Sequence, residues 1–227
     1  METNIGNFIT DVMLKGMKAD LAVLNSGTLR ADAIIEAGPI RMRDLVNILP
    51  MLDELCLLQL TGEQILQVLE NSVSQYPRLE GRFAQVSGVT FTFDAKGSPG
   101  SRVLRDTVKI GGAALEHQRC YKLCTKDYLR QGKDGYDVFR DAVCLADGEQ
   151  AGILPSMVRE HFKAIEALNG DAPEASTAMA GRALSRQASK RQATMDLSRI
   201  GEGPECTKRF AIAPQVEGRV VCLNPAT

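Results

Sequence analysis

The stretch LCLLQLTGEQILQVLENSV, residues 55–73, decides the fold. Its first six residues form an almost continuous apolar run, which is typical of a buried β-strand. Thr61 and Gln64 then have the spacing of a capping box, in which two side chains satisfy free backbone groups at the start of a helix. Apolar residues recur at helical spacing after that start: Ile65, Leu66, Leu69 and Val73. The stretch therefore predicts a buried strand that passes directly into an amphipathic helix.

Two helices and one strand are expected before this stretch. The apolar residues between positions 5 and 13 repeat at helical spacing and predict an amphipathic helix. Residues 21–24 form an apolar run that predicts a buried strand, which the turn-rich residues 25–28 interrupt. Residues 42–49 fit a short helix that Pro50 stops, because the residue before a proline disfavours helical geometry.

After the stretch the apolar period changes from helical to alternating. Val89, Phe91 and Phe93 alternate with polar residues, which predicts a strand with one buried face. Further elements are expected as strands at 103–110 and 121–125, a short helix or turn at 136–143, and a helix at 153–168. Helices come early and most strands come late, which predicts an α+β (mixed α/β) domain with a mostly mixed or antiparallel sheet.

The domain is expected to span residues 1–169 and to be followed by a tail over residues 170–227. Ala, Ser, Gly, Arg and Gln dominate the tail, and Phe210 is its one aromatic residue. So little apolar area cannot offset the entropy of ordering a chain, so the tail is expected to be basic and disordered. Three hydroxyls follow an arginine at the spacing that basophilic kinases use, at Ser185, Ser189 and Thr194. A regulatory role and a plain solvated tail both remain open.

The composition narrows the class of protein. The 227 residues are 44% apolar and 24% charged with a formal net charge of −1, so nothing favours nucleic acid or an anionic membrane as a partner. No apolar run approaches the length of about 18 residues that a membrane span needs, and the opening METNIGNFITDV is not a signal peptide. The six cysteines form no CxxC pair, so free thiols are expected and a cytoplasmic location is weakly favoured.

Four short segments, in order along the chain, match the motifs of one known family. They read ETNIGN at 2–7, NSGTLR at 25–30, LPM at 49–51 followed by LTG at 60–62, and YLRQGKDGY at 128–136. The family patterns are E-S/T-N-x-G-N, N-G/S-G-x-x-R, L-P-F followed by L-x-G, and F/Y-L-x-x-G-x-D-G-Y/F. Over residues 2–165 the chain thus resembles the C-terminal domain of the 5'-nucleotidase family.

The resemblance implies a function. The family joins an N-terminal metallophosphoesterase domain, which holds two metals, to this C-terminal domain. The C-terminal domain grips the nucleoside or another leaving group while the metals attack the phosphate. The chain is therefore expected to be the substrate-specificity domain of a 5'-nucleotidase-like phosphohydrolase of nucleotide catabolism.

The resemblance also assigns substrate-binding residues. Asn25 and Arg30 would face the substrate, and an arginine offers a rigid fork of donors to phosphate or ring acceptors. Tyr128 would stack on the base, which is worth about 1–3 kcal/mol. Asp134 would accept hydrogen bonds from the ribose hydroxyls. Met51 stands where the family commonly has a second aromatic ring, and a thioether offers no π-face.

Structural roles for the same residues stay open at this point. Asn25 suits a turn after a strand, where its side chain tolerates left-handed geometry. Arg30 alone is an ordinary surface residue, and Asp134 with Gly135 is a common turn pair. Tyr128 fits equally a core aromatic whose hydroxyl reaches the surface.

The catalytic half of the family pattern is expected to be missing. A two-metal centre needs many Asp, His and Asn ligands. The two histidines, His117 and His161, lie in none of the family's metal-binding contexts, so no cofactor is expected in this chain and its two divalent metals belong to the missing domain. The arginine that the family often places before its opening motif would precede Met1, so the domain is expected to be clipped at its N-terminal edge.

The expected partners follow from these assignments. They are a nucleoside, nucleotide or sugar-phosphate ligand and a metallophosphoesterase domain, in cis if a longer chain exists, with no nucleic acid and no membrane. The chain alone is not expected to hydrolyse phosphate esters. Three alternatives stay open, namely specificity for a phosphorylated sugar, a free-standing, non-catalytic binding module, and a non-functional remnant.

Overall fold

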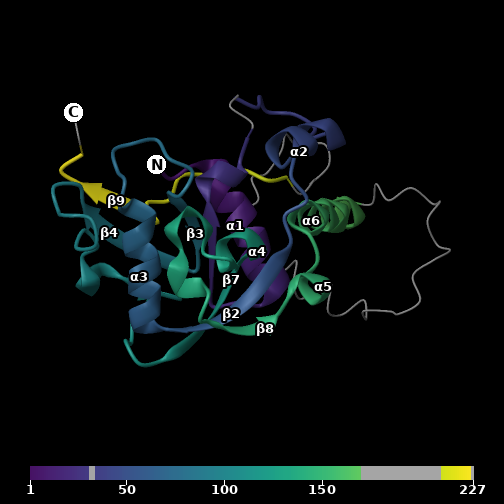
Figure 1. Cartoon of the computed structure of the whole chain (residues 1–227). Coiled ribbons are helices and arrows are strands. Elements are labelled where there is room, and N and C mark those ends of the chain that lie inside the picture. Colours follow the sequence, from purple (N-terminus) through teal and green to yellow (C-terminus); the bar gives the residue numbers. More distant parts are fainter. Residues whose placement is uncertain (31–33, 170–210, 226–227) are drawn as a thin grey trace. The chain divides into compact units, whose positions relative to one another are not determined.

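The computed structural model describes residues 1–30, 34–169 and 211–225. The chain divides into two units, Met1–Val158 with Gln215–Thr227, and Arg159–Pro214. The first unit holds both sheets, all the helices up to the start of the last one, and the candidate site (Figure 1). Helices and mixed sheets occur together, which confirms the predicted α+β class.

The larger sheet has five strands in the order β3-β1-β7-β2-β8. Its members are β1 (Leu21–Asn25), β2 (Leu55–Thr61), β3 (Ala84–Ser87), β7 (Cys120–Lys126) and β8 (Val143–Ala146). The pair β1–β7 is parallel, and the other neighbours are antiparallel. In the antiparallel β2–β7 pair Leu55 lies opposite Lys126, so this register places the buried charge of Lys126 beside the start of β2.

The smaller sheet has four strands in the order β6-β5-β4-β9. They are β4 (Val89–Asp94), β5 (Lys109–Ile110), β6 (Ala113–Ala114) and β9 (Val220–Leu223). Strand β9 pairs with β4 in parallel, with Phe91 opposite Val220 and Asp94 opposite Leu223. A strand from the end of the chain therefore completes a sheet begun more than a hundred residues earlier.

Most helices begin where the sequence places them. They are α1 (Asn4–Met17), α2 (Met42–Ile48), α3 (Gly62–Val73), α4 (Asp127–Arg130), α5 (Gly148–Ala151) and α6 (Leu154–Asn169). The predicted capping box at α3 is present, because Thr61 accepts from the backbone of Gln64 and the Gln64 side chain accepts from the backbone of Thr61. Short 3-10 turns occur at Ser26–Thr28, Arg105–Thr107, Lys133–Gly135 and Asp137–Phe139.

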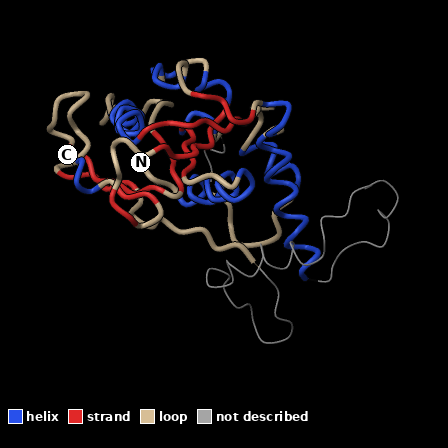
Figure 2. The backbone as a smooth tube through the Cα atoms, turned by 90° about the horizontal axis from the view of Figure 1, so that it is seen from below, coloured by secondary structure: helices blue, strands red, loops and turns tan. Residues whose placement is uncertain are grey.

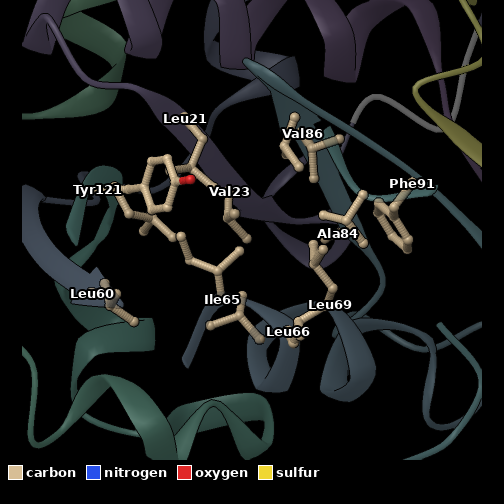
Figure 3. Close-up of a cluster of buried hydrophobic side chains, with 14 of the residues drawn as sticks. Leu21, Val23, Leu60, Ile65, Leu66, Leu69, Ala84, Val86, Phe91 and Tyr121 are labelled. Carbon is tan, nitrogen blue, oxygen red and sulfur yellow. The ribbon is translucent and has the colours of Figure 1, made fainter. Parts of the chain in front are cut away.

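Helices cover both faces of the larger sheet, and Figure 2 shows strands in red with helices in blue on either side. Leu21 and Val23 of β1 belong to the core cluster that also contains Ile65 and Leu69 of α3 (Figure 3). Ala22 and Leu24 alternate with them and are equally buried, so they point to the face on which α1 packs. Burying each leucine-sized side chain contributes about 1.5–3 kcal/mol, which makes this double layer the main source of stability.

The strand predicted over residues 103–110 is largely wrong. Only Lys109–Ile110 is a strand, and Val103 forms an isolated bridge to Phe93. The Glu70 carboxylate of α3 accepts the backbone N–H groups of Arg102 and Val103 at 2.9 and 2.8 Å. A side chain thus takes the place of a partner strand, which alternation along the sequence cannot reveal.

The five described cysteines are free thiols, as expected. Cys124 is buried in β7 and Cys120 is exposed at the start of the same strand. Burial raises the pKa of the Cys56 thiol to about 12, so this thiol stays protonated near neutral pH.

The prediction of a disordered tail over residues 170–227 is wrong for the part that contains β9. Arg219 is buried and its guanidinium binds both carboxylate oxygens of Asp11 on α1, at 2.8 and 2.9 Å. The Glu2 carboxylate accepts the backbone N–H groups of Glu217 and Val220. These polar contacts replace the apolar area whose lack suggested disorder. The rest of the predicted tail up to residue 210, including Ser185, Ser189 and Thr194, lies outside the described residues.

Candidate ligand-binding site

The candidate site is built around a loop that only glycine-rich sequence can form. Gly132, Asp134 and Gly135 all have positive φ angles, at 80°, 54° and 80°. Aspartate is one of the few residues with a side chain that tolerates this left-handed region. A Cβ atom at Gly132 would collide with the guanidinium of Arg140. The loop is therefore shaped to present the Asp134 side chain on a tight turn.

Two hydrogen bonds fix this loop to the rest of the domain. The side-chain amide of Asn71, on α3, donates to the Asp134 carbonyl oxygen at 3.1 Å. The hydroxyl of Tyr136, which is fully buried, donates to the Arg82 carbonyl oxygen at 2.6 Å. The Tyr136 ring also stacks parallel to that of Phe139 at a centroid distance of 5.4 Å. The Asp134 backbone is thus held from both sides.

The Asp134 carboxylate joins three of the residues predicted to bind substrate. One oxygen accepts from the side-chain amide of Asn25 at 2.7 Å, and the other accepts from the Tyr128 hydroxyl at 3.1 Å. Asn25 ends β1 and is buried, and its own oxygen accepts from the Thr28 hydroxyl at 2.7 Å. Two segments of the sequence, 109 positions apart at Asn25 and Asp134, therefore meet at one carboxylate.

The exposed ring of Tyr128 lies next to a buried cation, the ammonium group of Lys126. Its exposed fraction is 41%, while the Lys126 ammonium lies 4.6 Å from its ring centroid. That ammonium is 3.3 Å from both Asp53 carboxylate oxygens. Burial lowers the pKa of Lys126, and the Asp53 charge opposes this effect. Burial and the hydrogen bond to Asp134 raise the pKa of the Tyr128 phenol, so it stays a neutral donor near neutral pH.

Arg30 and Met51 lie outside these hydrogen bonds and ion pairs. Arg30 is exposed, and its backbone N–H donates to the Ile48 carbonyl oxygen at 3.0 Å. Its charge contributes to the lowered pKa of Lys126, which places it in the electrostatic neighbourhood of the site. Met51 is 47% exposed in the loop between α2 and β2, two residues before Asp53. We call Asn25, Asp53, Lys126, Tyr128 and Asp134 the Asp134 cluster.

Lys126 and Asp53 are members of the cluster that the motifs missed. Lys126 is the last residue of β7 and Asp53 lies just before β2. Because β2 and β7 are antiparallel with Leu55 opposite Lys126, the start of β2 lies beside the end of β7, and the two charges meet there. The signal in the sequence is a lysine at the end of a buried strand, and its partner becomes visible only once the strand pairing is known.

An open cavity of about 360 Å³ lies against α3. Glu63, Glu70, Asn71 and Arg105 are among its lining residues. None of the four motif segments contributes to its lining. Asn71 connects this cavity to the Asp134 cluster, because its side-chain amide donates to the Asp134 carbonyl oxygen.

Within residues 1–30, 34–169 and 211–225, no group of three or more His, Cys, Asp or Glu side chains could hold a metal ion. In the same part of the chain, no helix is both long and apolar enough to cross a membrane.

Comparison with known families identifies the domain. The model of the family described as "5'-nucleotidase, C-terminal domain" matches residues 1–141. The chain belongs to this family. The match confirms the resemblance that the four motifs indicated, and the matched residues include every member of the Asp134 cluster.

Several relatives of this 5'-nucleotidase C-terminal domain are much longer proteins. The trifunctional nucleotide phosphoesterase protein YfkN of Bacillus subtilis is 35% identical over an alignment of 160 positions, which covers 67% of this chain and 11% of that protein. The human 5'-nucleotidase is 29% identical over an alignment of 168 positions, which covers 66% of this chain and 29% of that protein. The chain thus spans less than a third of either relative.

Solved structures agree with the family assignment. The 5'-nucleotidase precursor of Thermus thermophilus superimposes with a TM-score of 0.68 and 25% identity, covering 99% of this chain and 36% of that one. The Haemophilus influenzae NAD nucleotidase superimposes with a TM-score of 0.60 at 21% identity, covering 71% and 30%. The second likeness shows a shared fold for the 5'-nucleotidase C-terminal domain.

Proposed function

We propose that this chain is the substrate-specificity domain of a 5'-nucleotidase-like phosphohydrolase and that the Asp134 cluster binds the nucleoside part of the substrate. The observation that supports this most directly is the meeting of Asn25, Tyr128 and Asp134. Asn25 is 109 positions from Asp134 in the sequence, and both carboxylate oxygens of Asp134 accept hydrogen bonds from the other two residues. An exposed ring beside a fixed carboxylate suits a ligand with a flat base and a neighbouring diol.

The proposed contacts follow from the chemistry of each group. An ionised carboxylate is an acceptor with two oxygens, and the two hydroxyls of a ribose are donors. The Tyr128 ring would stack on the base, and every base has a π-face to offer. Asn25 would keep the Asp134 carboxylate in place while the ligand hydroxyls replace the Tyr128 hydroxyl as its donors.

Phosphate ester hydrolysis would require a further domain. We propose that a metallophosphoesterase domain with two divalent metals supplies it, in cis where a longer chain exists. The lengths of the relatives support this, because the chain matches 36% of the Thermus thermophilus structure and 11% of the Bacillus subtilis protein. In that arrangement this domain would select nucleotides for breakdown by orienting their nucleoside part.

A phosphorylated sugar is the second candidate ligand, and Met51 is the observation that favours it. Met51 is 47% exposed and stands where a second aromatic ring would complete a sandwich around a base. A thioether offers no π-face, so the base sandwich would lack its second ring. A free-standing binding module would use the same cluster without turnover. Calorimetry with adenosine, ribose 5-phosphate and AMP separates the nucleoside from the sugar-phosphate candidate by which of these ligands binds.

The replacement Asp134→Asn tests the proposed diol contact. Asparagine tolerates the positive φ of 54° at this position, so the loop should keep its shape. A charge-assisted hydrogen bond is worth about 1.5–3 kcal/mol, so adenosine affinity should fall about 10- to 100-fold. The matched control is Asp137→Asn, which removes an exposed aspartate from the next turn. Calorimetry should show wild-type affinity for the control, and an unchanged affinity in Asp134→Asn would refute the contact.

The pair Tyr128→Ala and Tyr128→Phe tests stacking separately from hydrogen bonding. Loss of the ring should weaken adenosine binding by about 1–3 kcal/mol, because it removes one stacked base contact. Tyr128→Phe keeps the ring and loses only the bond to Asp134, so its adenosine affinity should stay within about threefold of wild type. Ribose 5-phosphate serves as the control ligand, because its affinity should not depend on the ring. Equal adenosine affinity in all three proteins would rule out stacking.

A further inference from the structure

Lys126 is a buried cation that the proposed function does not yet use. Its side chain is 5% exposed, whereas Lys122, four residues earlier on the same strand, is exposed. Moving an ammonium out of water is unfavourable by several kcal/mol unless it gains partners. A hydrophobic side chain would fill the same volume with less penalty. Burying a cation at this position is therefore less favourable for folding than burying an apolar side chain of the same size.

The surroundings of the ammonium define what it can do. Both Asp53 oxygens lie 3.3 Å away and compensate its charge. The Tyr128 ring centroid is 4.6 Å away, within the range of a cation–π interaction. The charges of Asp134 and Arg30 also act on Lys126, with opposite signs. The ammonium is thus neutralised on one side and faces an aromatic ring on the other.

We propose that Lys126 is a positioning residue that fixes the Tyr128 ring and leaves one ring face for the ligand. This rests on the proposed function, because the face matters only if a flat group stacks there. The ammonium lies over one face of the ring, so a base can approach the opposite face alone. Lys126 acts through Tyr128 and does not touch the ligand.

Two anchors hold the ring in this arrangement. The ammonium holds its face, and Asp134 accepts from its hydroxyl at 3.1 Å. Tyr128 lies on α4, a helix of four residues, and is 41% exposed, so packing alone holds it weakly. A ring fixed before binding loses less conformational freedom when the ligand arrives, which raises affinity. The second anchor is released if ribose takes the carboxylate, so the first then holds the ring alone.

The chain offers a clean spectroscopic test of this role without any ligand. It contains four tyrosines and no tryptophan, and the other three tyrosines, Tyr76, Tyr121 and Tyr136, are less exposed than Tyr128. Fluorotyrosine labelling should give four fluorine NMR resonances, and Tyr128→Phe assigns the one of interest. In Lys126→Met that resonance should shift and change width, while the other three stay in place and report an intact fold.

Matched variants separate positioning from a general loss of charge. Lys122→Met removes an exposed lysine from the same strand and should leave the Tyr128 resonance unchanged. Lys126→Arg keeps a cation that can lie on the ring and should restore the resonance toward its wild-type position. Lys126→Gln can still donate to Asp53 but carries no charge, and it replaces Lys126→Met should the latter fail to fold.

A double-mutant cycle with adenosine tests the consequence for binding. Lys126→Met should weaken adenosine binding about tenfold, within the span of a partly desolvated cation–π contact. In the Tyr128→Ala background the same change should alter affinity by less than about twofold, because the two residues form one interaction. Lys126→Arg should bind within about threefold of wild type.

The outcomes distinguish this proposal from the proposed function. An unchanged Tyr128 resonance in Lys126→Met overturns the positioning role, whatever adenosine does. An equal loss of affinity in both backgrounds also overturns it, because Lys126 would then act without Tyr128. The expected fluorine shifts together with no adenosine binding by the wild type would support the positioning role and reject the nucleoside ligand.

Discussion

Replacing Arg219 by methionine is expected to destabilise the domain by about 3–5 kcal/mol, the largest effect of a single charge that the described residues offer. The Arg219 side chain is 7% exposed and forms a bidentate ion pair with Asp11, at 2.8 and 2.9 Å. It also donates to Glu217 at 2.9 Å and to the Val86 carbonyl oxygen at 2.9 Å. The variant removes the guanidinium donors of Asp11 and of this carbonyl, and breaking a buried ion pair destabilises a protein more than replacing both partners does. Urea denaturation measures the loss.

The control for this prediction is an arginine whose ion pair is exposed. Arg159 lies 3.4 Å from Glu160, with side chains 46% and 58% exposed. Surface pairs are worth at most about 1 kcal/mol, so Arg159→Met should shift the unfolding midpoint little. Similar midpoints for the two variants would show that Arg219 is dispensable. The contact between β9 and α1 would then be incidental to stability.

The ion pair of Arg219 also shows why the end of the fold could not be predicted from the sequence. Arg219 and Asp11 are separated by 208 positions, and no local pattern links them. Strand β9 has four residues and pairs in parallel with β4, so it is neither long nor part of a hairpin. Sequence periodicity reports burial within one element, while a contact of this kind depends on the arrangement of the whole domain.

The elements that were predicted correctly carry their signal locally. The β2–α3 stretch has a continuous apolar run, a capping box and a helical apolar face within residues 55–73. Strand β3, which was not predicted, contains Gln85, a buried amide that donates to the Ser26 hydroxyl and the Met1 carbonyl oxygen. A polar residue in a four-residue strand hides the apolar pattern, and only its distant partners explain its burial.

Some residues of the candidate site could likewise be predicted from the sequence, and others could not. The motifs named Asn25, Tyr128 and Asp134, and the structure brings these three together. Arg30 is close enough for its charge to lower the pKa of Lys126. Met51 is exposed and lies outside the Asp134 cluster. The buried pair Lys126 and Asp53 requires the register of β2 against β7, which a single sequence does not specify.

Replacing Tyr136 by alanine is expected to destabilise the domain by about 3–5 kcal/mol, as for other large-to-small changes of a buried aromatic residue. Tyr136 is fully buried, stacks on Phe139 and donates to the Arg82 carbonyl oxygen. Urea denaturation measures this loss. Tyr136→Phe serves as the control, because it keeps the ring and loses one hydrogen bond, worth about 1 kcal/mol.

The same pair of variants tests whether the core determines the geometry of the site. Tyr136 follows Asp134 by two residues, and its buried ring anchors the turn that presents the carboxylate. In the fraction of Tyr136→Ala that is folded, adenosine affinity should therefore fall about tenfold, comparable to losing one hydrogen bond to a charged group. Tyr136→Phe should bind within about threefold of wild type. Wild-type affinity in folded Tyr136→Ala would instead mean that the positive φ angles at Gly132, Asp134 and Gly135 suffice to place the carboxylate.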